Sequence, residues 1–467
     1  MNRASARSSH SLMSSSQSQS SVRASTTDES GLRDLPRALP NHSHRSMKGS
    51  LGSLYALERQ RQRISQEIGG SASALNEWNY VMGGSSDRSS VPSVAGYDRG
   101  SVSGLSYATR KTGRGFREPT FQGVFRPKLI KRETSEIYAV KFSPNDEYIA
   151  AACGSSFIQM YSTSSNEMVR TLVPPAELGK DILPCTNVCF RPESNGYTNK
   201  NVLVAGYADG RIIHWHYTSG QIISTIQEDD IQINGLSYQA GYNDAPGQYF
   251  AACGSDTTVR IYDAQNHKKV LDMNGGQGFV SAGHSNRIFA VKFHPTDQHM
   301  LISGGWDNTI QFWDTRVGHS VRSIYGPHIC GADALDINAS GTEILSASFA
   351  KTDQLETWDY ATGALLETIP WSIMEGEKKS SMLYSASFGK SKGGQQYIIA
   401  GGCGSNNEIK MFNVQTGRAI GVVQGFTHSV YSVALSNNER MVAAGGAFKA
   451  VYSYDVDYAQ QTNELIY

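Results

Sequence analysis

Short runs of alternating apolar and polar residues, each ended by a turn, fill the chain from about residue 137 onward. They are clearest in residues 283–314, where runs at 288–293, 300–303 and 309–313 are separated by His-Pro and by Gly-Gly-Trp-Asp-Asn. Period-two alternation over such short runs predicts β-strands, so we expect a three-stranded antiparallel meander here. One such unit cannot bury both of its faces, and its stability therefore requires further copies.

The unit recurs along the chain, and each copy ends in an aromatic residue followed by a polar one: Tyr161-Ser162, Trp215-His216, Tyr262-Asp263, Trp313-Asp314, Trp358-Asp359, Phe412-Asn413 and Tyr454-Asp455. These ends are 42 to 54 residues apart, close to the roughly 40–45 residues of a four-stranded propeller blade. Fourth strands are expected in the connections, at 169–173, 221–226, 320–324, 365–369 and 419–423. The pattern predicts an all-β fold, a single seven-bladed β-propeller over residues 120–460.

The chain resembles the WD40 repeat family across about 330 of its 467 residues. Only the fourth unit carries the full family pattern, with Gly283-His284 before its first strand and Trp313-Asp314 at the end of its third. The resemblance implies a buried hydrogen-bond network, a structural tetrad of His284, Ser303, Asp307 and Trp313. The other units retain this pattern only in part. Unit five has His328, Ser346 and Trp358 with its acid displaced to Asp353, and we expect the degenerate blades to depend more on apolar packing.

In this family the outermost strand of the last blade comes from the sequence before the first repeat. The strand-like run in that position is Val124 to Lys131, so the closing strand is expected at about 124–131. Pro127 is compatible with an edge strand, where a missing N–H can face solvent.

The sequence before the propeller divides into three parts. Residues 1–46 are rich in Ser and poor in aromatic and β-branched residues, so we expect a disordered arm. Residues 50–82 contain apolar positions three and four residues apart, which predict an amphipathic helix over about 50–69 and a second short helix over 72–82. That helix either docks on the propeller, binds a partner or associates with another copy. A linker rich in Ser, Gly and Arg follows at 83–119, and residues 461–467 form a C-terminal tail.

Eight basic residues and one acid lie between residues 110 and 132, interspersed with phenylalanines. Such a segment can bind RNA. The candidate basic patch comprises Arg110, Lys111, Arg114 and Arg117. The competing interpretation is structural, with the segment closing the propeller and its positive charge lying on the rim.

Composition limits the remaining possibilities. The formal net charge is zero, which gives no support to polyanion binding by the whole molecule. No apolar run approaches 18 residues and no signal peptide is recognisable, so we expect no membrane span and a cytoplasmic protein, with nuclear and ciliary or cytoskeletal locations left open. The six cysteines agree with a reducing compartment and are expected to be structural thiols.

No motif for catalysis, cofactor binding or metal binding is recognisable, including around His214 and His216, so we expect neither an enzyme nor a cofactor. Loops on a rigid scaffold often carry binding residues, and aromatic and Arg side chains dominate interface energies. The candidate interface residues are therefore Trp306, Arg287, Arg316, Tyr207, Phe349, Phe448, Trp371 and Tyr325, with Trp306 foremost. The expected function is a protein-interaction scaffold or adaptor in a larger intracellular assembly. The alternatives are an RNA- or ribonucleoprotein-associated propeller using residues 110–132, a ubiquitin ligase substrate adaptor or a ciliary assembly component by family analogy, and an enzyme whose catalytic residues gather at the channel mouth.

Overall fold

The computed structural model describes residues 118–175, 183–193, 200–241, 245–275, 281–371, 381–390 and 396–459. The chain divides into two compact units, Met1–Gly69 and Gly70–Tyr467, and the described residues all belong to the second. The expected disordered arm, the helices within 50–82, nearly all of the linker and the tail at 461–467 lie outside the described residues. Within the described residues, no helix is long and apolar enough to cross a membrane.

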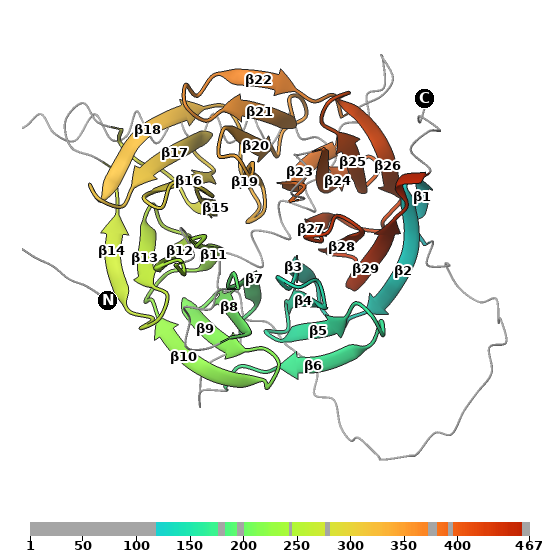
Figure 1. Ribbon diagram of the computed structural model, residues 1–467, viewed down its shortest axis with the longest axis horizontal. Coiled ribbons are helices and arrows are strands. Elements are labelled where there is room, and N and C mark those ends of the chain that lie inside the picture. Colours follow the sequence, from blue (N-terminus) through green and yellow to red (C-terminus); the bar gives the residue numbers. More distant parts are fainter. Residues whose placement is uncertain are drawn as a thin grey trace, which may run out of the picture. The chain divides into compact units, whose positions relative to one another are not determined.

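Seven antiparallel sheets surround a central channel, as Figure 1 shows. From the innermost strand outward, blade 1 consists of β3 (Ile137–Phe142), β4 (Tyr148–Cys153), β5 (Ile158–Ser162) and β6 (Met168–Leu172). Blade 2 consists of β7 (Cys185–Phe190), β8 (Val202–Tyr207), β9 (Arg211–His216) and β10 (Gln221–Gln227). Blade 3 consists of β11 (Ile233–Tyr238), β12 (Tyr249–Gly254), β13 (Val259–Asp263) and β14 (Lys269–Met273).

Blades 4 and 5 follow the same order and consist of β15 (Ile288–Phe293), β16 (Met300–Gly305), β17 (Thr309–Asp314) and β18 (His319–Tyr325); and β19 (Leu335–Ile337), β20 (Glu343–Ala347), β21 (Leu355–Asp359) and β22 (Leu365–Thr368). Blades 6 and 7 consist of β23 (Ser381–Phe388), β24 (Tyr397–Gly404), β25 (Glu408–Asn413), β26 (Arg418–Gln424) and β1 (Thr120–Gly123); and β27 (Val430–Leu435), β28 (Met441–Gly446), β29 (Ala450–Val456) and β2 (Phe125–Arg132). The prediction of an all-β, seven-bladed propeller is confirmed, as are the expected fourth strands.

The ring closes through β2, which pairs with β29 and completes blade 7. Its observed span agrees with the predicted closing strand. Pro127 is exposed on this outer strand, beside a register shift between Pro127 and Leu129. The missing N–H of proline is tolerated at such an edge position. Closure therefore joins the N-terminal end of the propeller to its C-terminal repeat.

Strand β1 was not predicted from the sequence. It adds a fifth strand outside β26, with Thr120 opposite Gln424 and Gly123 opposite Gly421. Four residues ending in glycine carry too little alternation to be recognised as a strand. Strand β26 is therefore paired on both of its edges, with β25 and with β1.

Adjacent blades pack closely because the second strand carries a small residue where the next blade's inner strand approaches. A β-carbon on Gly206, Gly304, Gly401 or Gly445 would lie 2.4 to 2.7 Å from a side chain of the following blade. No real β-carbon tolerates such a contact without displacement of its neighbour. The recurring Ala-Gly and Gly-Gly pairs in the second strands are thus a packing requirement.

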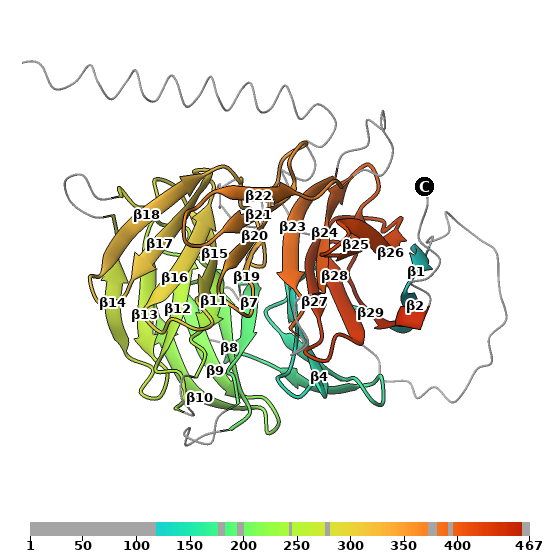
Figure 2. The ribbon, with the colours of Figure 1, turned by 45° about the horizontal axis from the view of Figure 1, so that its top comes forward.

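The connections gather at two rims (Figure 2). One rim carries the loop before each innermost strand and the loop between the second and third strands, and we call it the upper rim. In blade 4 these loops are residues 283–287 and 306–308. The lower rim carries the other turns, represented by residues 294–299 and 315–318. Because Thr120 pairs with Gln424, immediately before an upper-rim loop, the chain enters the propeller at the upper rim.

Candidate functional site

The His, Ser, Asp and Trp side chains of blade 4 form one hydrogen-bonded chain. Nε1 of Trp313 donates to Oγ of Ser303 at 2.7 Å, Nε2 of His284 lies 2.7 Å from the same oxygen, and Nδ1 of His284 lies 2.8 Å from Oδ2 of Asp307. The carboxylate can only accept from Nδ1–H, so Nε2 accepts from the serine hydroxyl. The side chains of His284 and Asp307 are 0% and 4% exposed. The His284–Asp307 pair is therefore inaccessible to a substrate, and it stabilises the blade.

Burial alone would raise the pKa of Asp307. The hydrogen bond from His284, together with those from the backbone N–H of Ser285 and the hydroxyl of Thr309, outweighs burial and holds the pKa below its usual range. The ionised carboxylate is thus the form that the network stabilises.

Several degenerate blades replace this brace with a buried carboxylate, contrary to the expectation that apolar packing would take its place. In blade 3 the Tyr262 hydroxyl donates to Glu228 at 3.0 Å, and Arg260 pairs with both Glu228 and Asp256. In blade 1 Tyr161 donates likewise to Glu133. Since burial raises the pKa of a phenol, both tyrosines remain protonated donors.

In blade 6 Glu408 accepts from the indole N–H of Trp371 and is paired with Lys410. Blade 7 follows the expected apolar arrangement, with Phe426, Phe448 and Tyr452 in mutual ring contact.

Blade 5 keeps half of the brace. Trp358 donates to Ser346 at 2.9 Å, whereas His328 lies 2.6 Å from Oδ1 of Asn308 in the preceding blade. The two-residue insertion that displaces Asp353 removes the acid that His328 would otherwise meet. His328 therefore links blades 4 and 5.

The eight candidate interface residues differ in exposure and in position on the propeller. Tyr207, Trp371 and Phe448 are 0%, 3% and 5% exposed, so their assignment to an interface is wrong, because aromatic side chains at these loop ends fill the space between blades. Arg316 lies on the lower rim, paired with Asp314, and Tyr325 is 74% exposed at the end of β18.

The remaining three residues, Trp306, Arg287 and Phe349, lie partly buried on the upper rim of blades 4 and 5. The guanidinium of Arg287 lies 4.8 Å from the centre of the Trp306 ring, and the indole N–H of Trp306 points to Sγ of Cys330 at 3.1 Å. The ring centroids of Phe289 and Trp306 lie 5.4 Å apart. Trp306 is thus half-buried and held in one orientation.

A set of side chains at the channel mouth was missed by sequence reasoning. In six blades the register of the innermost strand shifts near its start, around the second residue in five of them, as between Ile137 and Ala139, and around the fourth residue, Tyr384, in blade 6. A β-bulge turns the extra residue out of the sheet, here towards the channel. With Ala332 from blade 5, we call these the channel-mouth residues: Tyr138, Thr186, Asn234, Phe289, Ala332, Tyr384 and Tyr431.

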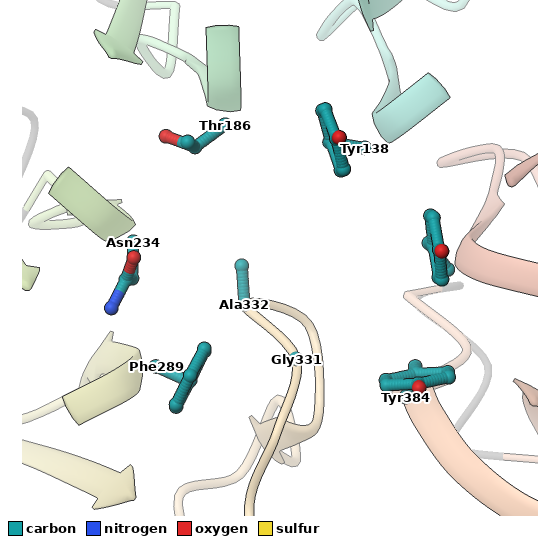
Figure 3. A pocket seen from close by; sticks show the side chains of 8 residues that line it. Tyr138, Thr186, Asn234, Phe289, Gly331, Ala332 and Tyr384 are labelled. Carbon is teal, nitrogen blue, oxygen red and sulfur yellow. The ribbon is translucent and has the colours of Figure 1, made fainter. Parts of the chain in front are cut away.

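These residues line one shallow hollow, and Figure 3 shows Tyr138, Thr186, Asn234, Phe289, Ala332 and Tyr384 arranged around it. No Asp, Glu or His lines this hollow in the part of the chain that the structure describes. The acid–base groups that the enzymatic alternative requires at the mouth are therefore not among its described lining residues.

Blade 5 narrows the channel from within. Its inner strand β19 has three residues, and the segment before it crosses to blade 6, where Asp333 bridges Ser385. The Asp333 carboxylate pairs with Lys141 of blade 1 and accepts from Ser432 of blade 7 at 3.0 Å. Burial would raise the pKa of Asp333, but Lys141 and Lys292 together outweigh it and lower the pKa.

Potential metal sites have structural explanations. The ring of His214 stacks on His267 at 4.1 Å, and burial lowers the pKa of both. No group of three or more metal-ligating side chains occurs among the described residues. All six cysteines are free thiols, and burial raises the pKa of Cys153 to about 12 and that of Cys403 to about 11.

The candidate basic patch of Arg110, Lys111, Arg114 and Arg117 lies outside the described residues. The rest of that segment is used structurally. Lys128 pairs with Asp455 and Lys131 with Glu167, both at 3.0 Å, and Arg126 lies 3.8 Å from Asp457. These three charges are compensated within the propeller.

Comparison with known proteins agrees with this architecture. The family described as WD domain, G-beta repeat, matches residues 127–162, 220–263 and 277–314. Cell division cycle 20.1, cofactor of APC complex, from Arabidopsis thaliana is 24% identical over 50% of this chain and 46% of its own length. Nuclear distribution protein PAC1 from Candida tropicalis is 30% identical over 36% of this chain and 32% of its own.

The Target of rapamycin complex subunit wat1 from Schizosaccharomyces pombe is 28% identical over 41% of this chain and 57% of its own length. The chain thus spans less than two thirds of each of these relatives. Together with the closed ring of seven blades and the His-Ser-Asp-Trp brace of blade 4, the repeat matches show that the chain belongs to the WD40 repeat family of β-propellers.

Proposed function

We propose that this protein is a non-enzymatic scaffold that holds partner proteins on its upper rim, within a larger intracellular assembly. The observation that carries the proposal is the half-buried Trp306, which is held by Arg287, Cys330 and Phe289. An indole held between a guanidinium, a thiol and a phenyl ring is preorganised, so partner binding requires little further loss of side-chain freedom.

Arg287 adds specificity to this surface. It is half-buried, burial lowers its pKa, and no carboxylate lies within 4 Å of it among the described residues. A partially desolvated guanidinium gains from a carboxylate in a partner protein. The surface therefore suits a partner segment that combines an apolar side chain for Trp306 with an acidic one for Arg287.

The names of the relatives support an assembly role. One is a cofactor of the APC complex and another is a subunit of the target of rapamycin complex. By analogy, we propose that this chain also acts as an adaptor within a multi-protein complex. Six free thiols support a reducing compartment such as the cytoplasm. Binding of RNA is not favoured, because three basic residues of the closing strand, Arg126, Lys128 and Lys131, are already paired with carboxylates.

The test compares proteins retained in native cell extract by the tagged full chain and by its variants. Trp306→Ala and Arg287→Glu are expected to lose the same set of partners. Arg316→Glu, on the lower rim, is the matched control and should retain them. Thermal unfolding of each variant establishes that the propeller remains folded. If the upper-rim variants keep every partner, the binding surface is wrong. If the wild type retains no partner, the scaffold function is wrong.

A further inference from the structure

The innermost strands encircle the axis of the ring and run from the upper rim to the lower rim, so the penultimate residue of each strand lies near the lower end of the channel (Figure 1). In every blade the residues before and after this position are buried, whereas the penultimate residue itself is partly exposed in five blades. This alternation places the penultimate side chains towards the channel. We call them the lower ring: Lys141, Cys189, Ser237, Lys292, Asp336, Ser387 and Ala434.

Positive charge is in excess at this end of the channel. The lower ring contributes Lys141, Lys292 and Asp336. Asp333 and Lys390, which flank the innermost strands of blades 5 and 6, add one charge of each sign. Three lysines thus face two aspartates, which leaves a surplus of one positive charge among the described residues.

The three lysines converge although they belong to three different blades. Burial raises the pKa of the Cys189 thiol, and the charges of Lys141, Lys292 and Lys390 all oppose that rise. Cys189 itself lies on the innermost strand of a fourth blade. Side chains from four blades can influence one another in this way only across the channel.

Two of these lysines have unused hydrogen-bond donors. Nζ of Lys292 lies 3.9 Å from Oδ1 of Asp336, which is too far for a hydrogen bond, and Oδ2 of this carboxylate accepts from the Phe388 N–H at 3.0 Å. In the part of the chain that the structure describes, Lys390 has no carboxylate within 4 Å and donates no side-chain hydrogen bond. Each ammonium group carries three donors, so both can serve an added acceptor.

Lys390 shows the electrostatic consequence of this crowding. Its side chain is exposed, yet burial lowers its pKa, as expected for a group that points into a channel open to solvent. The Asp336 carboxylate opposes the effect of burial, but the charges of Lys292 and Lys141 add to it, and the pKa remains lowered. An anion placed between the lysines relieves their repulsion and accepts from the unused donors.

We propose that the lower end of the channel binds a phosphate group, as inorganic phosphate or as part of a small soluble molecule. Lys292 and Lys390 donate to the phosphate oxygens from blades 4 and 6, and Lys141 adds its charge from blade 1. The oxygens of a phosphate point in tetrahedral directions, so one group can accept from lysines on several sides, whereas the two oxygens of a carboxylate lie on one side. This site is independent of the proposed scaffold function, because it lies at the opposite end of the channel from Trp306.

The experiment measures dissociation constants for the full chain by ligand-observed phosphorus NMR at constant ionic strength. The probes are inorganic phosphate and methyl phosphate, and acetate is followed by proton NMR as the carboxylate comparison. Lys390→Met and Lys292→Met each remove one ammonium group and keep an apolar stem. Lys268→Met is the matched control, because Lys268 is exposed on the lower-rim turn of blade 3, outside the channel.

The wild type and Lys268→Met are expected to bind phosphate equally, whereas Lys390→Met should weaken binding at least about tenfold, because a charge-assisted hydrogen bond is lost. Lys292→Met should have a similar effect. Acetate should bind much more weakly than either phosphate probe. Tighter binding of methyl phosphate than of inorganic phosphate would identify a small phosphorylated molecule as the ligand, and the reverse order would identify free phosphate.

Urea denaturation separates binding from folding. Without phosphate, Lys390→Met should be at least as stable as the wild type, because it removes a charge that its surroundings disfavour. Saturating phosphate should stabilise the wild type and Lys268→Met but not Lys390→Met. A merely structural role of Lys390 predicts neither result.

Three outcomes would overturn the inference. The wild type would bind no phosphate at millimolar concentrations, or Lys390→Met would bind it as tightly as the wild type, or acetate would bind as tightly as phosphate. None of them affects the scaffold function, which fails only if the wild type retains no partner or if the Trp306 and Arg287 variants keep every partner.

Discussion

Replacement of His284 by alanine is expected to lower the free energy of unfolding of the propeller by about 2–3 kcal/mol. The imidazole lies between two buried groups, Ser303 at 2.7 Å and Asp307 at 2.8 Å. Without it, the serine hydroxyl loses its acceptor and the carboxylate loses one donor. An unsatisfied buried polar group costs about 1–3 kcal/mol. The serine hydroxyl retains Trp313, and the carboxylate retains the Ser285 N–H and both the N–H and the hydroxyl of Thr309, so each penalty falls near the lower end of that range.

Urea denaturation followed by tryptophan fluorescence measures this loss, with Trp313 as an internal reporter. His428→Ala is the matched control, because His428 is exposed on the upper rim and its ring forms a hydrogen bond with the neighbouring Thr427. The control should lie within about 0.5 kcal/mol of the wild type. A double-mutant cycle with Ser303→Ala should show a coupling of about 1 kcal/mol, since the two side chains share a hydrogen bond. If His284→Ala is as stable as the control, the network does not brace the blade and the chemical interpretation of His284 and Asp307 must be reconsidered.

Three further predictions concern charge. Burial lowers the folded-state pKa values of His214 and His267, so the unfolded chain binds more protons than the folded chain near pH 6. The free energy of unfolding should therefore fall as the pH drops from 7 to 5. His267→Asn, which suits the φ of +55° at that position, should flatten this decline in urea denaturation. Burial and the nearby Asp353 raise the pKa of Glu356 to about 7. The free energy of unfolding should therefore fall as the pH rises from about 4.5 to 7. In the same assay at pH 8, Glu356→Gln should be more stable than the wild type by about 1–3 kcal/mol. Asp333→Ala leaves Lys141 without its partner and should cost about 3 kcal/mol, whereas Asp333→Ala combined with Lys141→Met should recover part of that loss in thermal unfolding.

The ring itself could be predicted from sequence because it depends on repetition. Period-two strands, aromatic ends and a single well-preserved unit suffice to place the blades. The closing strand and the brace of blade 4 were expected because the chain resembles the WD40 repeat family, whose pattern the fourth unit carries in full. Strand β1 was not, because four residues ending in Gly123 acquire strand geometry only through pairing with β26.

The braces of the degenerate blades could not be predicted because their partners are distant in sequence. Tyr262 meets Glu228, 34 residues away, and Trp371 meets Glu408, 37 residues away. Nothing in the local sequence marks these carboxylates as buried. The same limitation misassigned Tyr207, Trp371 and Phe448 to an interface, because a loop-end aromatic residue has the same sequence pattern whether it faces solvent or the next blade.

The channel mouth follows from a bulge that the alternating pattern cannot display. The residue before each bulge is apolar or a buried thiol and fully buried, comprising Ile137, Cys185, Ile233, Ile288, Leu383 and Val430. The bulged residue next to it varies among Tyr, Thr, Asn and Phe. The first position therefore accepts only an apolar side chain or a thiol, whereas the bulged side chain varies in type although it too is buried. Thr186 and Asn234 each donate to a carbonyl oxygen of the following blade, at Ile233 and Ile288, so the bulged position joins neighbouring blades around the channel. Because these partners belong to the next repeat, the alternating pattern of one strand cannot reveal them.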